Sequence, residues 1–443
     1  MFKLAFLSIG KINFDFELAK RLTSELYSQL LQKGFQVVGI DHVTQNLEEL
    51  RLIIKDIRDE TIDLVVVFQS TFTDNTLILE VANSIDAPIL LWAVPEKWDG
   101  GRLKLNSLSG INLASHTLHR HNIVYFYVYA DPHDEKAYFQ LSSIARAGKV
   151  RRRLKNKTLA LIGETPTGFD TSNYDATKLQ SVFGISIRRY DLGEFFKRVR
   201  TITSEHTESI KKSLSQKLAC LENLDALAVG KTLAVYQAMQ DLTKEDGING
   251  IAIRCWPEFF TDLGCAACGA LSLTMDDGIA CNCEGDVGGM VTQLMLQGLS
   301  SQPAVGVDVV GVNAEENCMA IWHCGNAPLS IANPSSLPEA IPHQNRKIPF
   351  AMQFAFKPGR VTLGRLTQSE SDMKLVVGQG EMLNAPRPFA ATSGVLRFDR
   401  PALEILEFLM TTGIEHHISF TYGNYEFDLQ ALAKILHLPV LNL

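Results

Sequence analysis

Short apolar runs alternate with longer amphipathic segments over the first 150 residues of the chain. Segment 16–33 repeats leucine at helical spacing and ends at Gly34, so it is predicted to be a helix. Because strands that are apolar throughout and alternate with helices form parallel sheets covered on both faces, we predict a doubly wound α/β domain at 1–150. The apolar runs expected to form its strands lie at 4–9, 35–40, 64–69, 89–94 and 123–129.

The same alternation starts again after a basic segment and predicts a second α/β domain at 151–333. Residues 146–157 carry seven Lys or Arg and no acidic residue. This is typical of a solvated junction between domains, with a polyanion-binding patch as the alternative. The apolar runs expected to form strands of the second domain lie at 158–162, 186–190, 224–228, 250–256, 279–283 and 305–312.

From residue 334 onward, the expected strands follow one another with Pro-Gly or polar turns between them, and a helix is expected at 401–412. Strands joined by short turns pair antiparallel, so this region is predicted to be a small antiparallel sheet or barrel. The predicted fold is therefore two Rossmann-like, doubly wound parallel-sheet domains followed by a β-rich, barrel-like domain at 334–443. The strands expected in this last domain lie at 350–356, 360–367, 374–379 and 394–398.

Composition narrows the class of protein. The chain has 443 residues, enough for several domains, with 42 Lys or Arg against 49 Asp or Glu and a net charge of −7. This balance argues against a nucleic-acid partner held by phosphate neutralisation. Since no apolar run approaches the roughly 18 residues of a membrane span and the N-terminus lacks a signal-peptide pattern, we expect a cytoplasmic protein with reduced thiols and no membrane partner.

Four of the eight cysteines lie close together in the sequence, at Cys265, Cys268, Cys281 and Cys283. One hypothesis is a structural zinc or iron–sulfur site in a non-catalytic protein. However, C-x₂-C followed by C-x-C is not a standard zinc spacing, and reduced cysteine is common in protein cores. We therefore interpret the four cysteines as packing residues.

Two carboxylates follow neighbouring strand candidates in the second domain. Glu258 comes after the run that ends at Trp256, and Asp286 comes after the run that ends at Cys283. Ligands of open α/β sheets bind beyond the carboxyl ends of the strands, and adjacent strands are about 4.8 Å apart. A carboxylate in this position is often only the cap of the following helix. Because both occupy equivalent positions, we expect them to converge on a metal ion or a small substrate.

Histidines supply the remaining candidate ligands. His416 and His417 stand together where a strand is expected to begin, and His323 ends the run 318–322. Carboxylate oxygens with imidazole nitrogens and no thiolate suit Mn²⁺ or Mg²⁺ better than zinc. Such a site polarises the adjacent oxygens of a hydroxy-carbonyl compound while a carboxylate moves the proton, which is the chemistry of an aldose–ketose isomerase.

The motifs RCWPEFF, CEGDVGG and EHHISF, together with the order of the domains, resemble the L-fucose and L-arabinose isomerase superfamily. The resemblance implies an aldose–ketose isomerase that works through a cis-enediol, with Mn²⁺ (or Mg²⁺ or Co²⁺) as cofactor. It makes Glu258 and Asp286 metal ligands and the acid/base pair, with His417 as a third ligand. The arabinose isomerase branch has a further histidine ligand, which His323 would supply. It also implies a homo-oligomer, commonly a hexamer with active sites at subunit contacts.

The substrate is open at this level. Trp92 and Trp256 are candidate sugar-stacking residues, with burial in the core as the alternative, and Asn326 and His416 are candidate substrate contacts. An isomerase of an anionic sugar such as sulfoquinovose would need one or two arginines for the anionic group, and a sugar-binding protein without turnover is a further alternative. The basic residues of the β-rich region are Arg346, Lys347, Lys357, Arg360, Arg365, Arg387 and Arg397.

Overall fold

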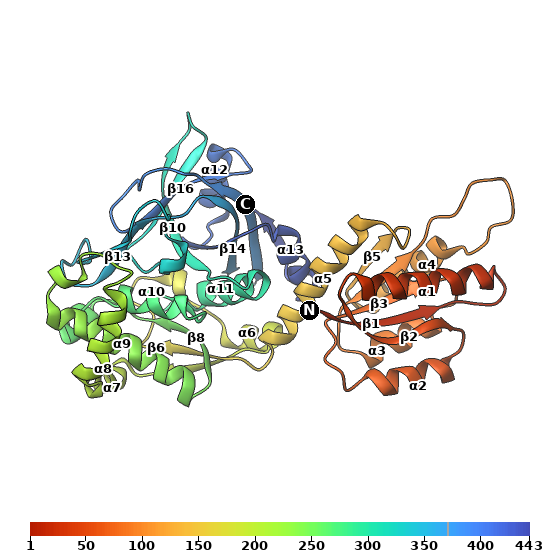
Figure 1. Cartoon of the computed structure of the whole chain (residues 1–443), viewed down its shortest axis with the longest axis horizontal. Helices are drawn as coiled ribbons and strands as arrows, with labels where there is room; N and C mark the ends of the chain where they lie inside the picture. Colours follow the sequence, from red (N-terminus) through yellow and green to blue (C-terminus); the bar gives the residue numbers. More distant parts are fainter. Residues whose placement is uncertain (370–371) are drawn as a thin grey trace. The chain divides into compact units, whose positions relative to one another are not determined.

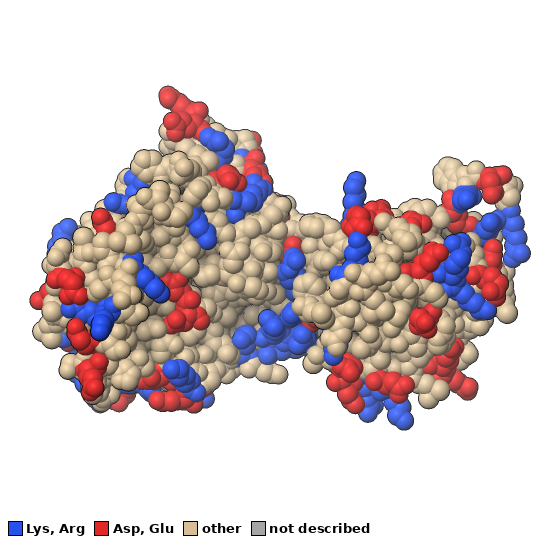
Figure 2. Space-filling model, viewed as in Figure 1, with Lys and Arg blue, Asp and Glu red and all other residues tan. Residues whose placement is uncertain are grey.

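The computed structural model describes residues 1–369 and 372–443. The chain forms two compact units, Met1–Arg152 and Arg153–Leu443. Acidic and basic side chains are interspersed on each unit over the face shown in Figure 2. In the described part of the chain, no helix is both long and apolar enough to cross a membrane.

The first unit contains a five-stranded parallel sheet in the order β2-β1-β3-β4-β5, as predicted for a helix-covered α/β domain (Figure 1). The strands β3 and β4 are buried along their whole length, which explains their unbroken apolar sequences. The strands are β1 (Lys3–Ile9), β2 (Gln36–Thr44), β3 (Leu64–Gln69), β4 (Ile89–Ala93) and β5 (Tyr125–Tyr129), and the helices are α1 (Phe16–Gln32), α2 (Leu47–Ile57), α3 (Thr76–Ser84), α4 (Ser107–Arg120) and α5 (Glu135–Leu154).

The second unit opens with a four-stranded parallel sheet in the order β7-β6-β8-β9. The run 224–228, predicted as a strand, is instead the start of a helix, because the Asp225 side chain accepts a hydrogen bond from Ala228 N and caps that helix. The strands are β6 (Thr158–Ile162), β7 (Ser186–Tyr190), β8 (Ile248–Ile253) and β9 (Ala280–Asn282), and the helices are α6 (Ala176–Phe183), α7 (Leu192–Thr201), α8 (Ser204–Leu214), α9 (Ala226–Glu245), α10 (Cys268–Asp276) and α11 (Val287–Ser300).

The remaining strands form a closed antiparallel barrel in the order β16-β11-β10-β17-β14-β15, with β15 pairing back onto β16. The barrel strands are β10 (Val305–Asn313), β11 (Cys318–His323), β14 (Gly359–Gln368), β15 (Met373–Met382), β16 (Thr392–Phe398) and β17 (His417–Tyr422). The short strands β12 (Glu339–Ile341), β13 (Ala351–Ala355) and β18 (Val440–Asn442) extend it, with helices α12 (Ala402–Thr412) and α13 (Glu426–Ile435) beside it.

The predicted mixture of parallel α/β sheets and a C-terminal barrel is confirmed, whereas the description of the two α/β parts as Rossmann-like stays a prediction. The barrel takes in more of the chain than the sequence indicated. Strand β10, expected at 305–312 in the second α/β domain, and strand β11 pair antiparallel with β17 and β16 and so belong to the barrel.

Two features of this fold bring polar side chains from the second sheet and from the barrel close together. Strands β8 and β9 are adjacent and parallel, with Ile251 paired to Cys281, so the loops after them leave the same edge of the sheet. The loop after β9 leads into α11, which packs against barrel strands β14 and β17. The carboxyl edge of the second sheet therefore faces the barrel strand that begins at His417.

Candidate active site

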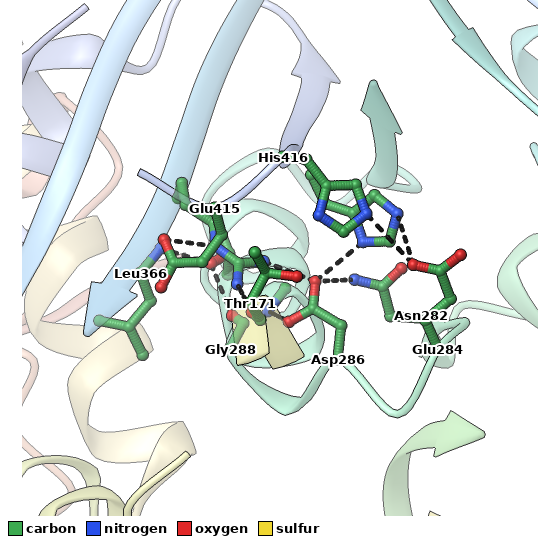
Figure 3. Close-up of polar contacts among 12 residues, drawn as sticks. Thr171, Asn282, Glu284, Asp286, Gly288, Leu366, Glu415 and His416 are labelled. Atoms are coloured by element: carbon green, nitrogen blue, oxygen red, sulfur yellow. Dashed lines mark hydrogen bonds and ion pairs between the residues drawn. The ribbon is translucent and has the colours of Figure 1, made fainter. Parts of the chain in front are cut away.

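Five side chains converge where β17 begins. They are Glu284, Asp308, His323, His416 and His417, called here the carboxylate–histidine cluster. Figure 3 shows Glu284 and His416 facing each other, and His416 Nε2 lies 3.1 Å from Glu284 Oε2. His417 Nε2 lies 3.7 Å from Glu284 Oε2 and 3.7 Å from Asp308 Oδ1. The same His417 nitrogen lies 3.3 Å from His323 Nε2.

The backbone explains this convergence. Asp308 of β10 is the register partner of His417 in β17, and paired residues of antiparallel strands place their side chains on the same face. His323 is the last residue of β11, which pairs with β10 on its other side. Glu284 lies in the loop after β9 with a positive φ of 58° and precedes Gly285, also at positive φ, so a tight turn aims its carboxylate at the histidines.

The cluster is organised electrostatically. Burial alone would raise the pKa of Glu284, but the hydrogen bond with His416 and the charges of His417 and His323 lower it below its ordinary value. The hydrogen bond to Glu284 raises the pKa of His416 despite partial burial. Glu284 is therefore a carboxylate at neutral pH, ready to bind a cation or accept a proton.

Asp286 lies beside the cluster and is saturated with hydrogen bonds (Figure 3). Its Oδ2 accepts from Arg365 Nη1 at 2.6 Å and from Asn282 Nδ2 at 3.0 Å, and its Oδ1 accepts from Gly289 N at 2.8 Å and caps α11. Although burial opposes it, the charge of Arg365 and the hydrogen bond with His417 hold the pKa of Asp286 far below its ordinary range.

The contact between Asp286 and His417 fixes the ring of the histidine. His417 Nδ1 lies 3.1 Å from Asp286 Oδ2, and both side chains are almost completely buried. When a carboxylate accepts a hydrogen bond from one ring nitrogen of a histidine, the other ring nitrogen is left oriented toward a ligand. Metal-binding histidines are commonly held in this way. The predicted proximity of Asp286 and His417 is present, and its geometry favours a positioning role for Asp286.

Glu258 has a different environment. It follows a cis peptide bond between Trp256 and Pro257, and its carboxylate forms a two-point ion pair with Arg254, at 2.7 and 2.9 Å. The described contacts join Glu258 neither to Asp286 nor to the histidines. Strands β8 and β9 are adjacent, as the predicted convergence of Glu258 and Asp286 requires. The carboxylate of Glu258 is nevertheless bound by Arg254.

Comparisons with known proteins bear on this site. A family model described as the fucose/sulfoquinovose isomerase N-terminal domain matches residues 8–155, and the L-fucose isomerase C-terminal domain matches residues 321–443. A protein named sulfoquinovose isomerase from Priestia megaterium (strain ATCC 12872 / QMB1551) is 30% identical over 436 residues, covering 98% of this chain and 97% of that protein. The chain belongs to the fucose isomerase-like superfamily. It is thus an enzyme of the aldose–ketose isomerase class.

Other relatives agree along the whole length of the isomerase. Proteins named sulfoquinovose isomerase from Alkalicoccus urumqiensis and Clostridium sp. (strain MSTE9) are 29% and 30% identical, covering 100% and 99% of this chain and 100% and 98% of their own. Among solved structures, a galactofuranose binding protein reaches a TM-score of only 0.18 at 12% identity, covering 68% of this chain and 90% of its own, which is too low for a comparison of folds.

The two predicted sugar-stacking tryptophans differ. Trp92 is fully buried in the first unit of the isomerase, its ring packs on Tyr138, and its Nε1 donates to Ala130 O, so it offers no face to a sugar and the prediction for it is corrected. Trp256 is half-buried and lies edge-on to Phe169 at 5.4 Å between ring centroids. Phe169 in turn contacts His416 at 6.1 Å, which places Trp256 beside the cluster.

Asn326 and the cysteines line the cluster on its buried side. Asn326 Nδ2 lies 3.8 Å from Cys283 Sγ, and Cys283 Sγ lies 3.1 Å from His323 Nε2. The hydrogen bond with Cys255 and burial raise the pKa of Cys283 well above its ordinary value, so this thiol is neutral. The arrangement agrees with cysteines as packing residues around the site.

The structural-zinc hypothesis required the four clustered cysteines to meet, and each has a different neighbour. Cys268 Sγ lies 3.6 Å from Cys324 Sγ, and Cys265 contacts Thr232. Cys281 is fully buried on β9, where desolvation raises its pKa far above the ordinary value. The described contacts therefore do not join the four as one ligand set, although Cys268 lies with Cys324 and His343, and Cys283 with His323 and His417, in groups close enough to hold a metal ion.

Glu284 and Asp308 were not singled out from the sequence. Two signals pointed to them. Glu284 lies two residues before Asp286 in the same CEGD loop, and Asp308 interrupts the otherwise apolar run VGVDVVGV. A charged residue inside an apolar strand is rarely buried without a partner.

Proposed function

We propose that the enzyme interconverts sulfoquinovose, or a closely related sulfonated hexose, with the corresponding ketose. The observation that carries the proposal is the carboxylate–histidine cluster, which holds two acids and three imidazoles at the end of the second sheet. The substrate assignment rests on relatives named sulfoquinovose isomerase that match almost the whole chain. Of the substrates considered from the sequence, the anionic sugar fits these relatives better than a neutral one.

The cluster is suited to one divalent cation. Asp308 Oδ1 is buried and has no hydrogen-bond partner in the described part of the chain, although it lies 3.7 Å from His417 Nε2. A buried carboxylate oxygen without a donor is costly unless a cation or a proton satisfies it. We propose Glu284, Asp308 and His417 as the ligands, and His323 as a further candidate ligand. The proposed cation is Mn²⁺, which Mg²⁺ or Co²⁺ could replace. The bound cation would polarise the two adjacent oxygens of the sugar.

The residues then account for the proton movements. In an aldose-to-ketose conversion through a cis-enediol, the proton on C2 moves to C1 and the hydroxyl proton on O2 moves to O1. Glu284 is ionised and can accept the C2 proton and return it to C1. Each carboxylate has two oxygens, so Asp308 can serve as a ligand with one and carry the hydroxyl proton with the other. Trp256 and Phe169 offer apolar ring surface for the sugar C–H groups.

The activity is tested with purified enzyme and sulfoquinovose in D₂O, followed by NMR. We expect conversion to the ketose with deuterium incorporated at C1, because a proton carried by Glu284 exchanges with solvent. Conversion without deuterium would contradict the proton-transfer route. No conversion at any divalent cation tested would contradict the proposed function itself.

Removing the metal gives an independent check. We expect dialysis against EDTA to abolish isomerisation and Mn²⁺ to restore it, with about one equivalent of metal per chain by elemental analysis. We also expect the metal-free enzyme to unfold at a lower temperature, since a ligand that binds only the folded state stabilises it. Full activity with no measurable bound metal would overturn the metal assignment.

A homo-oligomer, hexameric by family resemblance, and a cytoplasmic location belong to the same proposal. The oligomeric state is measured by light scattering.

A further inference from the structure

A sulfonated substrate poses a problem that the carboxylate–histidine cluster does not solve. The reacting carbons and the sulfonate stand at opposite ends of a six-carbon chain, and a sulfonate is a permanent anion at neutral pH. Two acids already occupy the reacting end. The far end therefore needs a cation that is near the cluster and is not neutralised by a carboxylate of the protein.

Of the arginines that the described contacts place at the cluster or at the rings beside it, two are already paired. Arg365 is buried, binds Asp286 and lies 3.3 Å from Glu415. Arg254 forms its two-point ion pair with Glu258. Neither guanidinium can turn to an outside anion without leaving a carboxylate unpaired, which is costly when the group is buried.

Arg346 lies at the rings beside the cluster, and its side chain is exposed. Its guanidinium carbon lies 5.7 Å from the centre of the Trp256 ring and 6.0 Å from that of Phe260. Over residues 1–369 and 372–443 no carboxylate forms an ion pair with it. A guanidinium held near aromatic rings without a carboxylate partner keeps N–H groups available, and two of them can bind two oxygens of one anion.

The rings connect Arg346 to the reacting end of the site. Trp256 contacts Phe169 at 5.4 Å, and Phe169 contacts His416 of the cluster at 6.1 Å. His416, Phe169 and Trp256 thus form a chain of ring contacts, called here the ring row, that links the cluster to the Arg346 guanidinium. A sugar lying along the ring row would have its reacting carbons at His416 and its far end at Arg346.

The loop that carries Arg346 is held in place. Arg346 N donates to His343 Nδ1 at 3.3 Å, and Lys347 N donates to His343 O at 2.7 Å, which closes a tight turn. The His343 ring packs on Phe260 at 5.2 Å. Burial, followed by the charge of Arg346, lowers the pKa of His343 to about 4, so the imidazole is neutral at neutral pH. Arg346 is therefore the positive group of this turn that lies over the ring row.

We propose that Arg346, whose guanidinium lies against the Trp256 and Phe260 rings, forms the subsite for the sulfonate of the substrate and selects anionic over neutral sugars. This inference rests on the proposed function, because it needs a substrate with an anionic end. The subsite acts on binding, since it contacts a group remote from the bonds that change. Its loss is therefore expected mainly in KM, with the proton transfers at the cluster left intact.

The test compares Arg346→Gln with Lys347→Gln, a matched loss of one exposed positive charge at the next residue. For Arg346→Gln we expect kcat/KM for sulfoquinovose to fall about 10- to 100-fold, mostly through KM, the range of one hydrogen-bonded charge pair. Lys347→Gln should stay within about 3-fold of the wild type, and Arg346→Lys should recover part of the loss. Methanesulfonate, used as a competitive inhibitor, should lose potency only in the Arg346→Gln enzyme. Metal content and melting temperature of each variant show that the cluster and fold are intact.

The possible outcomes distinguish a failure of the sulfonate subsite from a failure of the proposed function. If the wild type does not convert sulfoquinovose, both the proposed function and the subsite are overturned. If the wild type converts it and Arg346→Gln has an unchanged KM, only the subsite is overturned. An equal loss in Lys347→Gln would also overturn it, because the effect would then be general surface charge.

Discussion

Replacing Glu284 with glutamine is expected to lower kcat for isomerisation by at least about 1,000-fold, because the proposed mechanism uses this one carboxylate as both a metal ligand and the proton acceptor. Glutamine has nearly the same shape, so the loop should keep its form. The measurement is the initial rate of ketose formation at saturating Mn²⁺, with metal content determined on the same sample. A lowered metal content together with the lost rate would identify Glu284 as a ligand.

Glu258→Gln is the matched control, since the motif resemblance gave Glu258 the role that the geometry gives to Glu284. Its carboxylate is paired with Arg254, at 2.7 and 2.9 Å. We expect Glu258→Gln to retain its bound metal and to lose less than about 10-fold in kcat. If instead Glu258→Gln is the inactive variant and Glu284→Gln is not, the assignment from the cluster is wrong and that from the motifs is right.

Replacing Arg365 with methionine is expected to have the largest effect on stability, about 3–5 kcal/mol in the free energy of unfolding of the second unit. Arg365 and Asp286 are each only 2% exposed, and the guanidinium also serves Glu415 and the carbonyl of Thr171. Methionine fills a similar volume but leaves Asp286 and Glu415 without their cation. The measurement is the midpoint of unfolding of the full-length protein in urea and by heating.

Arg254→Met provides the comparison for that experiment. It removes the ion pair with Glu258, in which the Arg254 side chain is 21% exposed and the Glu258 side chain 27% exposed. Pairs that remain in contact with water contribute about 0–1 kcal/mol, so the expected shift is small. Equal destabilisation by the two methionine substitutions would show that burial of the Arg365 pair is not what makes it matter.

Local patterns were sufficient to predict most of the elements. Strands such as β3 and β4 are apolar because both faces of the sheet are covered, and that pattern is visible in the sequence. The segment 224–228 was predicted as a strand because a short apolar run shows neither helical nor strand periodicity. Asp225 caps a helix that begins at Ala226 instead. The extent of the barrel was underestimated, because the partner of β10 is β17, more than a hundred residues later.

The residues of the candidate site were predicted only where a local sequence pattern marks them. The histidines were found because His416 and His417 are adjacent and His323 ends a strand. Asp308 was not, because its significance lies in its register with His417, and register between distant strands leaves no local trace. Asp286 and Glu258 were placed next to strand ends correctly, but only the contacts show that arginines engage both.

The position of β17 in the barrel has a consequence for how the enzyme folds. This strand lies between β10 and β14 and pairs with both, so the barrel closes only when β17 has inserted between them. Before that step the barrel is an open sheet, and His417 does not lie beside Asp308 and Glu284. The proposed cation would therefore bind weakly before closure, and its capture would report that the barrel has closed.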